Sequence, residues 1–490
     1  MNQKEIEEYV NKAANTLKDI VEAADIKQYI FPLLFFKRIS DIWDEEYKKA
    51  VDIYGTDIDI SEMPENFRFQ IPDDCHWIDI RSVTTSIGER IQRILREIEN
   101  KNFEILHGVF GDAQWTNKNV LSDKKLTDLI EHLSTVELNL KNVPNDLMGN
   151  AFEYLVKEFA KETGHTAADF YTNRTIIDLV LELVKPEPGE SIYDPACGSG
   201  GFLVKSSLYL KSKAEEFRNL KLHGQELKVF TTSIARINMH MHGIDEFTII
   251  QGNTIDDPRI LENDELKQFD IIISNPTFSF DKWNQAKFTN DPFGRNILGT
   301  PPASIGDYAF QQHILQSLND STGRSVTVLP HGVLFRDSEL AMRQRMIELD
   351  FVEAVIGLGK NLFFGSGMES CLLVCRKDKP GDRKGKVLFI DAKEELKLER
   401  SEAYLLESHI KRISGVYHSF EEQEGFSKIV STNEILNNKG NLSIQLYIIQ
   451  ANNNEVHELD QLLALTKSNQ NELNSNIQNL FEQIKNLGIE

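Results

Sequence analysis

The stretch Ser191–Leu203, SIYDPACGSGGFL, decides the fold of this chain of 490 residues. A short apolar run ends at Asp194, three glycines follow within the four residues GSGG, and a helical pattern opens behind them. Glycine has no Cβ, so the backbone can turn with positive φ and approach a ligand closely. A strand, a glycine loop and a helix in this order predict a cradle for a nucleotide-like ligand. Leu203 stands where a dinucleotide site would carry its third glycine, which disfavours NAD, and a plain turn is the alternative interpretation.

A second motif follows an apolar run further along the chain. Phe269–Ser274, FDIIIS, is typical of a buried parallel strand and leads into Asn275–Phe278, NPTF. Asp-Pro-Ala-x-Gly-x-Gly-Gly-Phe followed by a segment close to Asn-Pro-Pro-Phe resembles the signature pair of amino-group DNA methyltransferases that use S-adenosylmethionine. Upstream, Asp169–Arg174, DFYTNR, is similar to the Glu-Phe-Tyr-Thr-Pro-Arg segment of one branch, the modification (methyltransferase) subunit of type I restriction–modification systems.

The resemblance covers nearly the whole chain up to about residue 395, in several segments that keep their order. The further matching segments are Ala24–Asp41, Gly306–Leu315, Pro330–Arg336 and Asn361–Gly365. Two positions depart from the family pattern. Thr277 replaces the second proline of Asn-Pro-Pro-Phe, which is expected to loosen the loop, and Asn173 replaces the proline of Tyr-Thr-Pro-Arg.

The predicted cofactor contacts combine this resemblance with positions at strand ends. Glu226 closes the second expected strand, where an acid can accept hydrogen bonds from ribose hydroxyls, although an exposed strand-end acid is the alternative. Asn253 stands where the family often contacts the adenine amino group. Thr172 or Asn173 is also a plausible cap for a helix that begins near Thr175. The expected contacts are Asp169, Phe170, Tyr171, Thr172, Asn173, Arg174, Asp194, Ser199, Gly200, Gly201, Glu226 and Asn253.

Asn275, Pro276 and Phe278 are the expected catalytic residues. An exocyclic aromatic amine is a poor nucleophile because its lone pair is delocalised into the ring. If the Asn275 side-chain oxygen and the Pro276 carbonyl accept its two hydrogens, the lone pair turns toward the methyl donor. Phe278 would stack on the base, which must leave the duplex. The alternative is an ordinary Asn-Pro turn.

Acidic residues outnumber basic ones by 76 to 54, which gives a formal net charge of −22. A protein that grips DNA alone usually has a basic surface, because neutralising phosphates supplies most of the affinity. The charge therefore indicates that another chain holds the DNA, and too little chain follows the expected sheet for a separate sequence-reading domain. The resemblance implies double-stranded DNA, a specificity subunit and a second copy of this chain as partners, and it allows for a restriction (nuclease and translocase) subunit.

No apolar run is long enough to span a bilayer, and the N-terminus is polar. The chain has four scattered cysteines, of which Cys371 and Cys375 share one face of an expected strand, which favours core packing. These features predict a reduced, cytoplasmic protein with no membrane partner. No metal site is predicted.

The apolar pattern divides the chain into parts. Residues 1–155 repeat apolar side chains at helical spacing and are expected to form a helical N-terminal domain. Residues 156–400 alternate strands and helices, which predicts an α/β fold, a doubly wound Rossmann-like methyltransferase sheet. Residues 401–454 are expected to form an irregular linker, rich in asparagine from residue 431. The expected strands are Ser191–Asp194, Lys221–Gln225, Phe247–Gln251, Phe269–Ser274, Ser325–Pro330, Phe351–Ile356, Ser370–Arg376 and Val387–Asp391.

Residues 455–490 carry a heptad pattern. Spacings of four and three alternate through Leu459, Leu463, Thr466, Gln470, Leu473, Ile477, Leu480, Ile484 and Leu487. This seam suits one helix of a coiled coil, and the alternative is a helix packed on its own domain. The resemblance favours a C-terminal helix that docks on the specificity subunit.

The sequence predicts a site-specific, adenine-specific DNA methyltransferase that transfers a methyl group to N6 of adenine. Two other functions compete with it. A protein-glutamine N5-methyltransferase presents a planar amide to the same geometry, but it is not expected to carry Phe170–Thr172, the long helical N-terminus or the heptad helix. A non-catalytic structural subunit would keep the fold while Thr277 abolishes transfer.

Overall fold

The chain forms two compact units, Met1–Ile448 and Ile449–Glu490. The expected heptad helix over 455–490 belongs to the second unit and, apart from Gln470, lies outside the described residues, so it stays a prediction. No described helix is long and apolar enough to cross a bilayer. The computed structural model describes residues 1–18, 23–55, 63–162, 171–363, 367–399 and 402–448, together with Gln470.

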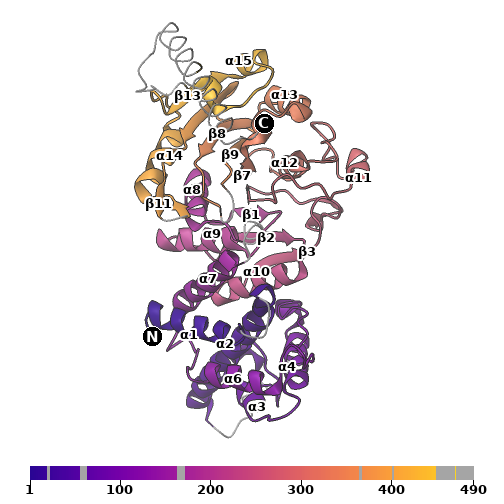
Figure 1. Cartoon of the computed structure of the whole chain (residues 1–490), viewed down its shortest axis with the longest axis vertical. Coiled ribbons are helices and arrows are strands. Elements are labelled where there is room, and N and C mark those ends of the chain that lie inside the picture. The colour runs from indigo at the N-terminus through magenta and orange to yellow at the C-terminus, as the bar shows by residue number, and fades with distance from the viewer. Residues whose placement is uncertain are drawn as a thin grey trace, which may run out of the picture. The chain divides into compact units, whose positions relative to one another are not determined.

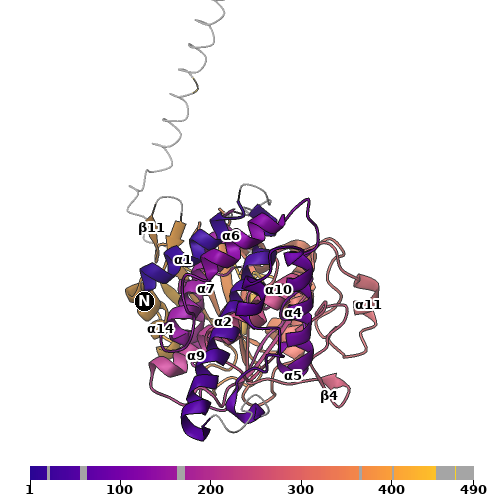
Figure 2. The ribbon, with the colours of Figure 1, turned by 90° about the horizontal axis from the view of Figure 1, so that it is seen from below.

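The N-terminal part is helical, as its apolar repeat predicts (Figures 1 and 2). Its helices are α1 (Gln3–Asn15), α2 (Ala23–Tyr54), α3 (Trp77–Arg81), α4 (Ile87–Lys101), α5 (Phe103–Leu106), α6 (Asp123–Leu133) and α7 (Asn145–Glu162), with a 3-10 turn, η2 (Pro64–Asn66). The core of these helices also takes in Ile234, Ile237 and Met241 of α10 (Val229–Met241), a helix of the sheet region. Because α7 buries Phe152 and Phe159 in this core, the helical packing continues past residue 155.

A nine-stranded sheet forms the rest of this unit, in the order β13-β10-β8-β9-β7-β6-β1-β2-β3. Neighbouring strands are parallel except at β9 and β13, which run antiparallel to their neighbours. The eight expected strands are present, three with the expected bounds and five with ends shifted by one or two residues, and β13 is additional. The strands are β1 (Ser191–Asp194), β2 (Lys221–Glu226), β3 (Phe247–Gln251), β6 (Ile271–Ser274), β7 (Arg324–Pro330), β8 (Val352–Leu358), β9 (Ser370–Arg376), β10 (Lys386–Ala392) and β13 (Ser427–Ser431).

Helices cover both faces of the sheet, which confirms the expected doubly wound fold. In β6, Ile271 and Ile273 point into one apolar core and Ile272 points into the other, because successive side chains of a strand alternate. The first core is completed by α8 (Arg174–Val184), α9 (Gly201–Ser212), α10 and α14 (Glu407–Ser419). The second is completed by α12 (Asp307–Gln316), α13 (Leu340–Glu348), α15 (Thr432–Asn437) and α16 (Ile444–Tyr447). Smaller elements are α11 (Gln285–Thr289), η4 (His331–Leu334), η5 (Asp337–Glu339) and the hairpins β4–β5 (Leu261–Glu262, Glu265–Leu266) and β11–β12 (Lys397–Glu399, Glu402–Tyr404).

The expectation of an irregular linker from residue 401 is wrong for residues 402–448. This segment contains β12, α14, β13, α15 and α16, and β13 extends the sheet by pairing with β10. Two of the asparagines that suggested a loop have local roles at helix ends. Asn438 ends α15, and the Asn441 side chain accepts a hydrogen bond from the Ser443 amide at 2.8 Å just before α16.

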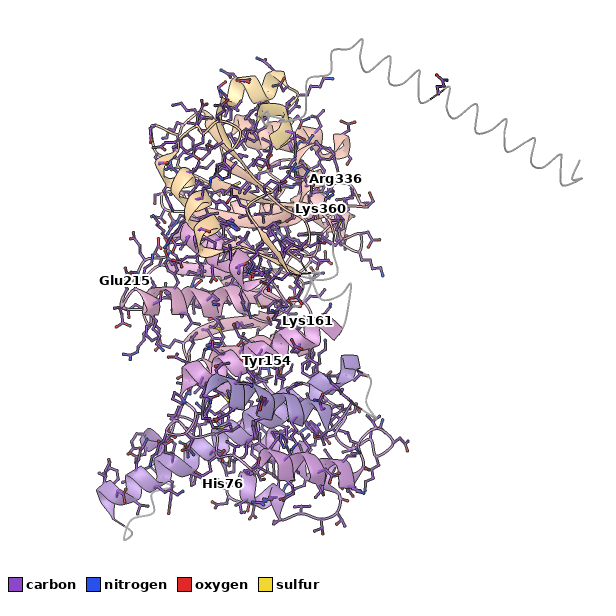
Figure 3. All side chains as sticks on the ribbon, turned by 60° about the vertical axis from the view of Figure 1, so that its left-hand side comes forward. His76, Tyr154, Lys161, Glu215, Arg336 and Lys360 are labelled. Carbon is purple, nitrogen blue, oxygen red and sulfur yellow. The ribbon has the colours of Figure 1, made fainter. Side chains whose placement is uncertain are left out.

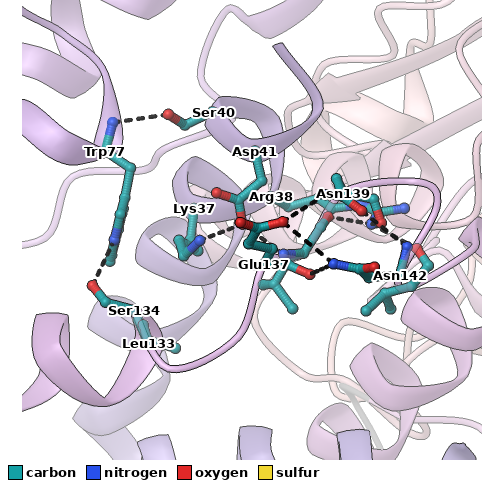
Figure 4. A network of polar contacts seen from close by, with 12 residues as sticks. Lys37, Arg38, Ser40, Asp41, Trp77, Leu133, Ser134, Glu137, Asn139 and Asn142 are labelled. Carbon is teal, nitrogen blue, oxygen red and sulfur yellow. Dashed lines mark hydrogen bonds and ion pairs between the residues drawn. The ribbon is translucent and has the colours of Figure 1, made fainter. Parts of the chain in front are cut away.

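Buried polar side chains of α2 hold the loop that leads into α7 (Figure 4). Lys37 and Asp41 form an ion pair, and Asp41 also accepts a hydrogen bond from the Leu138 amide at 2.6 Å. Arg38 donates to the carbonyl of Leu138. It also donates to three further acceptors, the Asn139 and Val143 carbonyls at 3.0 and 2.7 Å and the Asn145 side chain at 3.0 Å. Burial lowers the pKa of Arg38 to about 10, so the guanidinium stays charged at neutral pH. The family-like segment Ala24–Asp41 therefore has a structural role at this loop.

Arg38→Lys is expected to lower the free energy of unfolding by about 2–4 kcal/mol, because lysine cannot reach four separate acceptors with one ammonium group. Urea denaturation of the full chain measures this loss. The control is Lys4→Gln in α1, where an exposed pair with Glu8 should contribute under about 0.5 kcal/mol. Equal losses in the two variants would contradict the clamping role of Arg38.

Candidate active site

The carboxyl ends of four neighbouring strands bring the predicted residues together. β6, β1, β2 and β3 are adjacent, and they end at Ser274, Asp194, Glu226 and Gln251. A narrow pocket over the glycine loop includes Thr172 and Asn275. A larger cavity of about 450 Å³ adjoins this pocket, since Ala196 and Asn275 line both. Its volume lies within the usual range of small-molecule sites.

The larger cavity has a polar and an aromatic lining. The end of β2 contributes Glu226 and the loop after β3 contributes Asn253. The segment after β6 contributes Asn275 and Phe278, with Phe310 from α12. A carboxylate beside aromatic rings suits a ligand with hydroxyl groups and flat heterocyclic parts.

The glycine loop after β1 turns through the left-handed region. Gly198 and Gly200 have φ angles of 52° and 77°, which favour glycine. A Cβ on Gly200 would lie 3.4 Å from the Cβ of Ala235 on α10, an ordinary contact, so it is the turn that favours glycine here. Ser199 is buried, and its carbonyl accepts a hydrogen bond from the Asn238 side chain at 2.9 Å. The loop is thus fixed from α10.

Asp194 closes β1 and is 1% exposed. Its Oδ1 accepts hydrogen bonds from the Ala196 amide at 3.1 Å and from Ser274 Oγ at 2.8 Å. Burial raises the pKa of Asp194 to about 7, the two hydrogen bonds oppose this shift, and the charge of Glu226 adds to it. Asp194 therefore ties the glycine loop to the end of β6.

Glu226 closes β2 with a carboxylate that is already oriented. Its two oxygens accept hydrogen bonds from the Gly198 and Lys228 amides, each at 3.0 Å. Each carboxylate oxygen has two lone pairs, so the group can also accept from ligand hydroxyls. This geometry agrees with the role expected for Glu226 at the cavity.

The segment before α8 reaches the motif that follows β6. Asp169 and Phe170 lie outside the described residues, so their expected contacts stay predictions. Thr172 Oγ1 accepts a hydrogen bond from Asn275 Nδ2 at 3.1 Å. The contact leaves Oδ1 of Asn275 to serve as an acceptor toward the cavity.

Asn173 is the N-cap of α8, one of the two caps that the sequence suggested. Its Oδ1 accepts from the amide and hydroxyl of Thr175 at 3.1 and 2.9 Å, while its Nδ2 donates to the carbonyls of Leu362 and Ala403 at 3.2 and 2.9 Å. Asparagine in place of the family's proline thus provides a side-chain amide that joins three segments of the chain. Both polar atoms of this side chain are hydrogen-bonded within the protein.

Arg174 forms an ion pair with Glu153 of α7, with Nε–Oε2 at 3.1 Å and Nη2–Oε1 at 2.8 Å. Its guanidinium stacks over the Tyr171 ring at 4.7 Å. A Cβ on Gly201 would lie 2.0 Å from Arg174 Nη1, so Gly201 leaves room for this side chain. Tyr171, Arg174 and Gly201 all line the narrow pocket, where Arg174 holds the wall in place.

Asn275, Pro276 and Phe278 follow β6 as the sequence predicts. Asn275 is partly exposed and Pro276 is buried, while Phe278 lines the larger cavity. Phe278 packs edge to face against Phe363, with ring centroids 5.9 Å apart. An amide oxygen and an aromatic ring thus lie beside the same cavity.

Asn253 lines the cavity, but its side chain is engaged in its own loop. Its Oδ1 accepts from the Ile255 and Asp256 amides at 3.0 and 3.1 Å, and its Nδ2 donates to the Asp256 carboxylate at 3.0 Å. These bonds favour a role in shaping the cavity wall over the adenine contact that the sequence suggested.

Two residues of this site were not expected from the sequence. Glu153 lies inside a helical apolar pattern with no motif around it. Asp307 lies in the family-like segment Gly306–Leu315, which could have marked it, and it accepts a hydrogen bond from the Ser279 amide at 2.6 Å. Among the described residues, no group of three or more His, Cys, Asp or Glu side chains could hold a metal ion.

The sequence matches the N-6 DNA Methylase family over residues 143–456 and the HsdM N-terminal domain over residues 6–133. The type I restriction enzyme MjaVII methylase subunit of Methanocaldococcus jannaschii is 31% identical over 341 residues, which cover 67% of this chain and 57% of that protein. The type I restriction enzyme MpnII methylase subunit of Mycoplasma pneumoniae is 24% identical over 533 aligned residues, which cover 98% of this chain and 96% of that protein.

A crystal structure of the type I restriction-modification system methyltransferase subunit from Streptococcus thermophilus has the same fold, with a TM-score of 0.80 and 24% identity. The match covers 92% of this chain and 100% of that one. The family match, the relatives and the geometry at the strand ends agree with one another. The chain therefore belongs to the N-6 DNA methylase family, among the methylase subunits of type I restriction–modification systems.

Proposed function

We propose that this chain transfers a methyl group from S-adenosylmethionine to N6 of adenine in DNA, as the methyltransferase subunit of a type I restriction–modification complex. The observation that carries this function is the position of Asn275, whose amide borders both the glycine-loop pocket and the larger cavity. A methyl donor over the loop and a base in the cavity would meet at this side chain.

The described residues fit S-adenosylmethionine. The Glu226 carboxylate retains acceptor capacity for ribose hydroxyls, and the glycine loop leads into the N-terminus of α9. Asp194 in its ionised form would favour a cationic sulfonium over a neutral thioether. When bound, this cofactor supplies an electrophilic methyl group.

Asn275 and Pro276 supply acceptors for the target amine. Asn275 Nδ2 is held by Thr172, so Oδ1 can accept one hydrogen of the amino group, and the Pro276 carbonyl can accept the other. Both acceptors draw the nitrogen lone pair out of conjugation and direct it into the site. Phe278 offers an aromatic face for a base that has left the duplex.

A methylation assay with labelled S-adenosylmethionine, cognate DNA and the specificity subunit tests this proposal. We expect N6-methyladenine in the DNA digest. N4-methylcytosine would move the substrate to cytosine, and labelled glutamine in protein would favour a protein methyltransferase. No incorporation at all would favour a structural subunit without activity.

Glu226→Gln is expected to weaken S-adenosylmethionine binding by about tenfold to a hundredfold, because hydrogen bonds to a charged group contribute about 1.5–3 kcal/mol. Isothermal titration calorimetry on the full chain measures the change. The control is Glu215→Gln, an exposed acid beyond the far end of α9 (labelled in Figure 3). Unchanged affinity in Glu226→Gln would remove this residue from the site.

The partners are proposed from the charge of −22 and the heptad pattern of residues 455–490. A specificity subunit would hold the DNA between two copies of this chain, and the final helix would dock on that subunit. Ending the chain after residue 454 should abolish co-purification with the specificity subunit while cofactor affinity stays within about twofold, because the removed segment contains none of the expected cofactor contacts. A truncated chain that still assembles and methylates would contradict the docking role.

A further inference from the structure

The loop after β6 lacks the second proline that the family pattern has, and Thr277 in its place is exposed. Proline fixes φ, so a threonine leaves this segment with more conformational freedom. Transfer to an amine needs acceptors held within a fraction of an ångström, since a misplacement of about 1 Å can cost about a hundredfold in rate. Other contacts must therefore hold Asn275 and Pro276 in place.

The first half of this loop is held from β1 and from the segment before α8. Ser274 Oγ donates to Asp194, and Asn275 donates to Thr172. These contacts fix the strand end and the Asn275 side chain. These two hydrogen bonds do not reach the backbone beyond Pro276.

The second half is held from the start of α12. The Ser279 amide donates to Asp307 Oδ1 at 2.6 Å, and the Gly306 amide donates to the Phe280 carbonyl at 2.9 Å. A Cβ on Gly306 would lie 2.2 Å from the Phe280 ring, so the glycine lets this ring lie against the backbone. Ser279 has a φ of 51°, a strained value for serine that these contacts maintain.

Asp307 is itself firmly held, with a side chain that is 2% exposed. Its Oδ2 pairs with Arg336 Nη2 at 2.9 Å, and its position in the first turn of α12 suits a negative charge. Arg336 (labelled in Figure 3) also pairs with the buried Glu339 at 3.3 Å, and its carbonyl accepts from Arg343 at 2.7 Å. The two family-like segments Gly306–Leu315 and Pro330–Arg336 thus meet at one ion pair behind the loop.

We propose that Asp307, oriented by Arg336, is a positioning residue that fixes the loop Asn275–Phe280 and supplies the rigidity that the second proline would give. The rate measurements that test this inference rest on the proposed function, because they need methyl transfer. Asp307 acts through the backbone of Ser279 and does not touch the reacting groups.

The test compares Asp307→Asn with Asp350→Asn in the complete complex. Asp350 also pairs with a buried cation, Lys379, at 2.6 Å and accepts from the Gly385 amide at 2.9 Å, but it precedes β8, away from the carboxyl ends of the strands that form the candidate site. Asp307→Asn should lower kcat by at least about tenfold with cofactor affinity within about twofold, since a neutral acceptor forms a weaker bond and loses the ion pair. Asp307→Ala should lower kcat further, and Asp350→Asn should leave it within about twofold.

Thr277→Pro is the decisive second change, because the Thr277 amide donates no hydrogen bond within the described part of the chain. Added to Asp307→Asn, it should restore kcat by at least about fivefold, while in the wild-type chain it should change kcat by less than about threefold. Loss of packing alone would not be repaired by a proline in the loop. Equal effects of Thr277→Pro in both backgrounds would overturn the proposal.

Hydrogen exchange separates this inference from the proposed function. In the cofactor-free chain, Asp307→Asn should speed exchange of the Ser279 amide by about tenfold or more, and Asp350→Asn should not. An inactive wild-type complex would refute methyl transfer, whereas the exchange rates would still decide whether Asp307 fixes the loop. Unchanged exchange in Asp307→Asn would refute the positioning role even in an active enzyme.

Discussion

Replacing Asn275 with alanine is expected to lower the rate of methyl transfer by about 10²–10³-fold, the size of effect seen when one preorganised partner of a developing charge is removed. Cofactor affinity should stay within about twofold, because the proposed role of Asn275 is toward the target amine, whereas the carboxylate and the glycine loop proposed to hold the cofactor lie at the carboxyl ends of β2 and β1. The variant should therefore lower kcat and kcat/KM together. Single-turnover methylation of cognate DNA measures the chemical step directly.

Thr172→Val is the matched control for this prediction. It removes the group that accepts from Asn275 Nδ2 at 3.1 Å and leaves the Asn275 oxygen in the chain. The loss should be about tenfold, since a side chain that has lost its orientation still populates the productive rotamer for part of the time. Near-wild-type turnover in Asn275→Ala would contradict the mechanism, and equal losses in both variants would mean that orientation is the whole effect.

The sheet could be predicted because most of its strands are continuous apolar runs, which buried parallel strands require. β13 could not, since it is an edge strand in which Ser427, Lys428 and Ser431 leave no such run. The strand order and the antiparallel β9 depend on packing between distant segments. The connection between β8 and β9 does indicate that β9 is antiparallel. No helix occupies the described residues between these strands, and a parallel pair needs a long crossover connection.

The site could be predicted where its residues directly follow strands. Asp194 and Glu226 end their strands, and Asn275 directly follows one. Because neighbouring parallel strands have their carboxyl ends side by side, these residues come together at one end of the strands. Glu153 could not be assigned, and the segment Gly306–Leu315 could mark Asp307 but not its contact, because the partners Arg174 and Ser279 are brought to these acids only by tertiary packing. The sequence also could not show that the side chains of Asn253 and Asn173 are bound within the protein. Asn253 bonds to groups of its own loop, whereas Asn173 Nδ2 bonds to the distant carbonyls of Leu362 and Ala403.

The Glu153–Arg174 pair connects the helical core to the site, and its removal is expected to have the second large effect. α7, on which Tyr154 and Lys161 are labelled in Figure 3, packs its apolar side chains into the helical core and directs Glu153 to Arg174. The two side chains are only 12% and 14% exposed. Arg174→Met would leave the Glu153 carboxylate buried without its partner, which should lower the free energy of unfolding by about 3–5 kcal/mol.

The double variant Glu153→Gln with Arg174→Met distinguishes a buried charge from a lost contact. Neither residue is then charged, so the loss of stability should be smaller than for Arg174→Met alone, by about 1–3 kcal/mol. Cofactor affinity should stay reduced by at least about tenfold in both variants, because methionine cannot stack on Tyr171 as a guanidinium does. Guanidinium chloride denaturation and calorimetry measure the two quantities separately. A double variant that recovers affinity along with stability would show that Arg174 acts only through the stability of the helical core, and the wall of the narrow pocket would then depend on other residues.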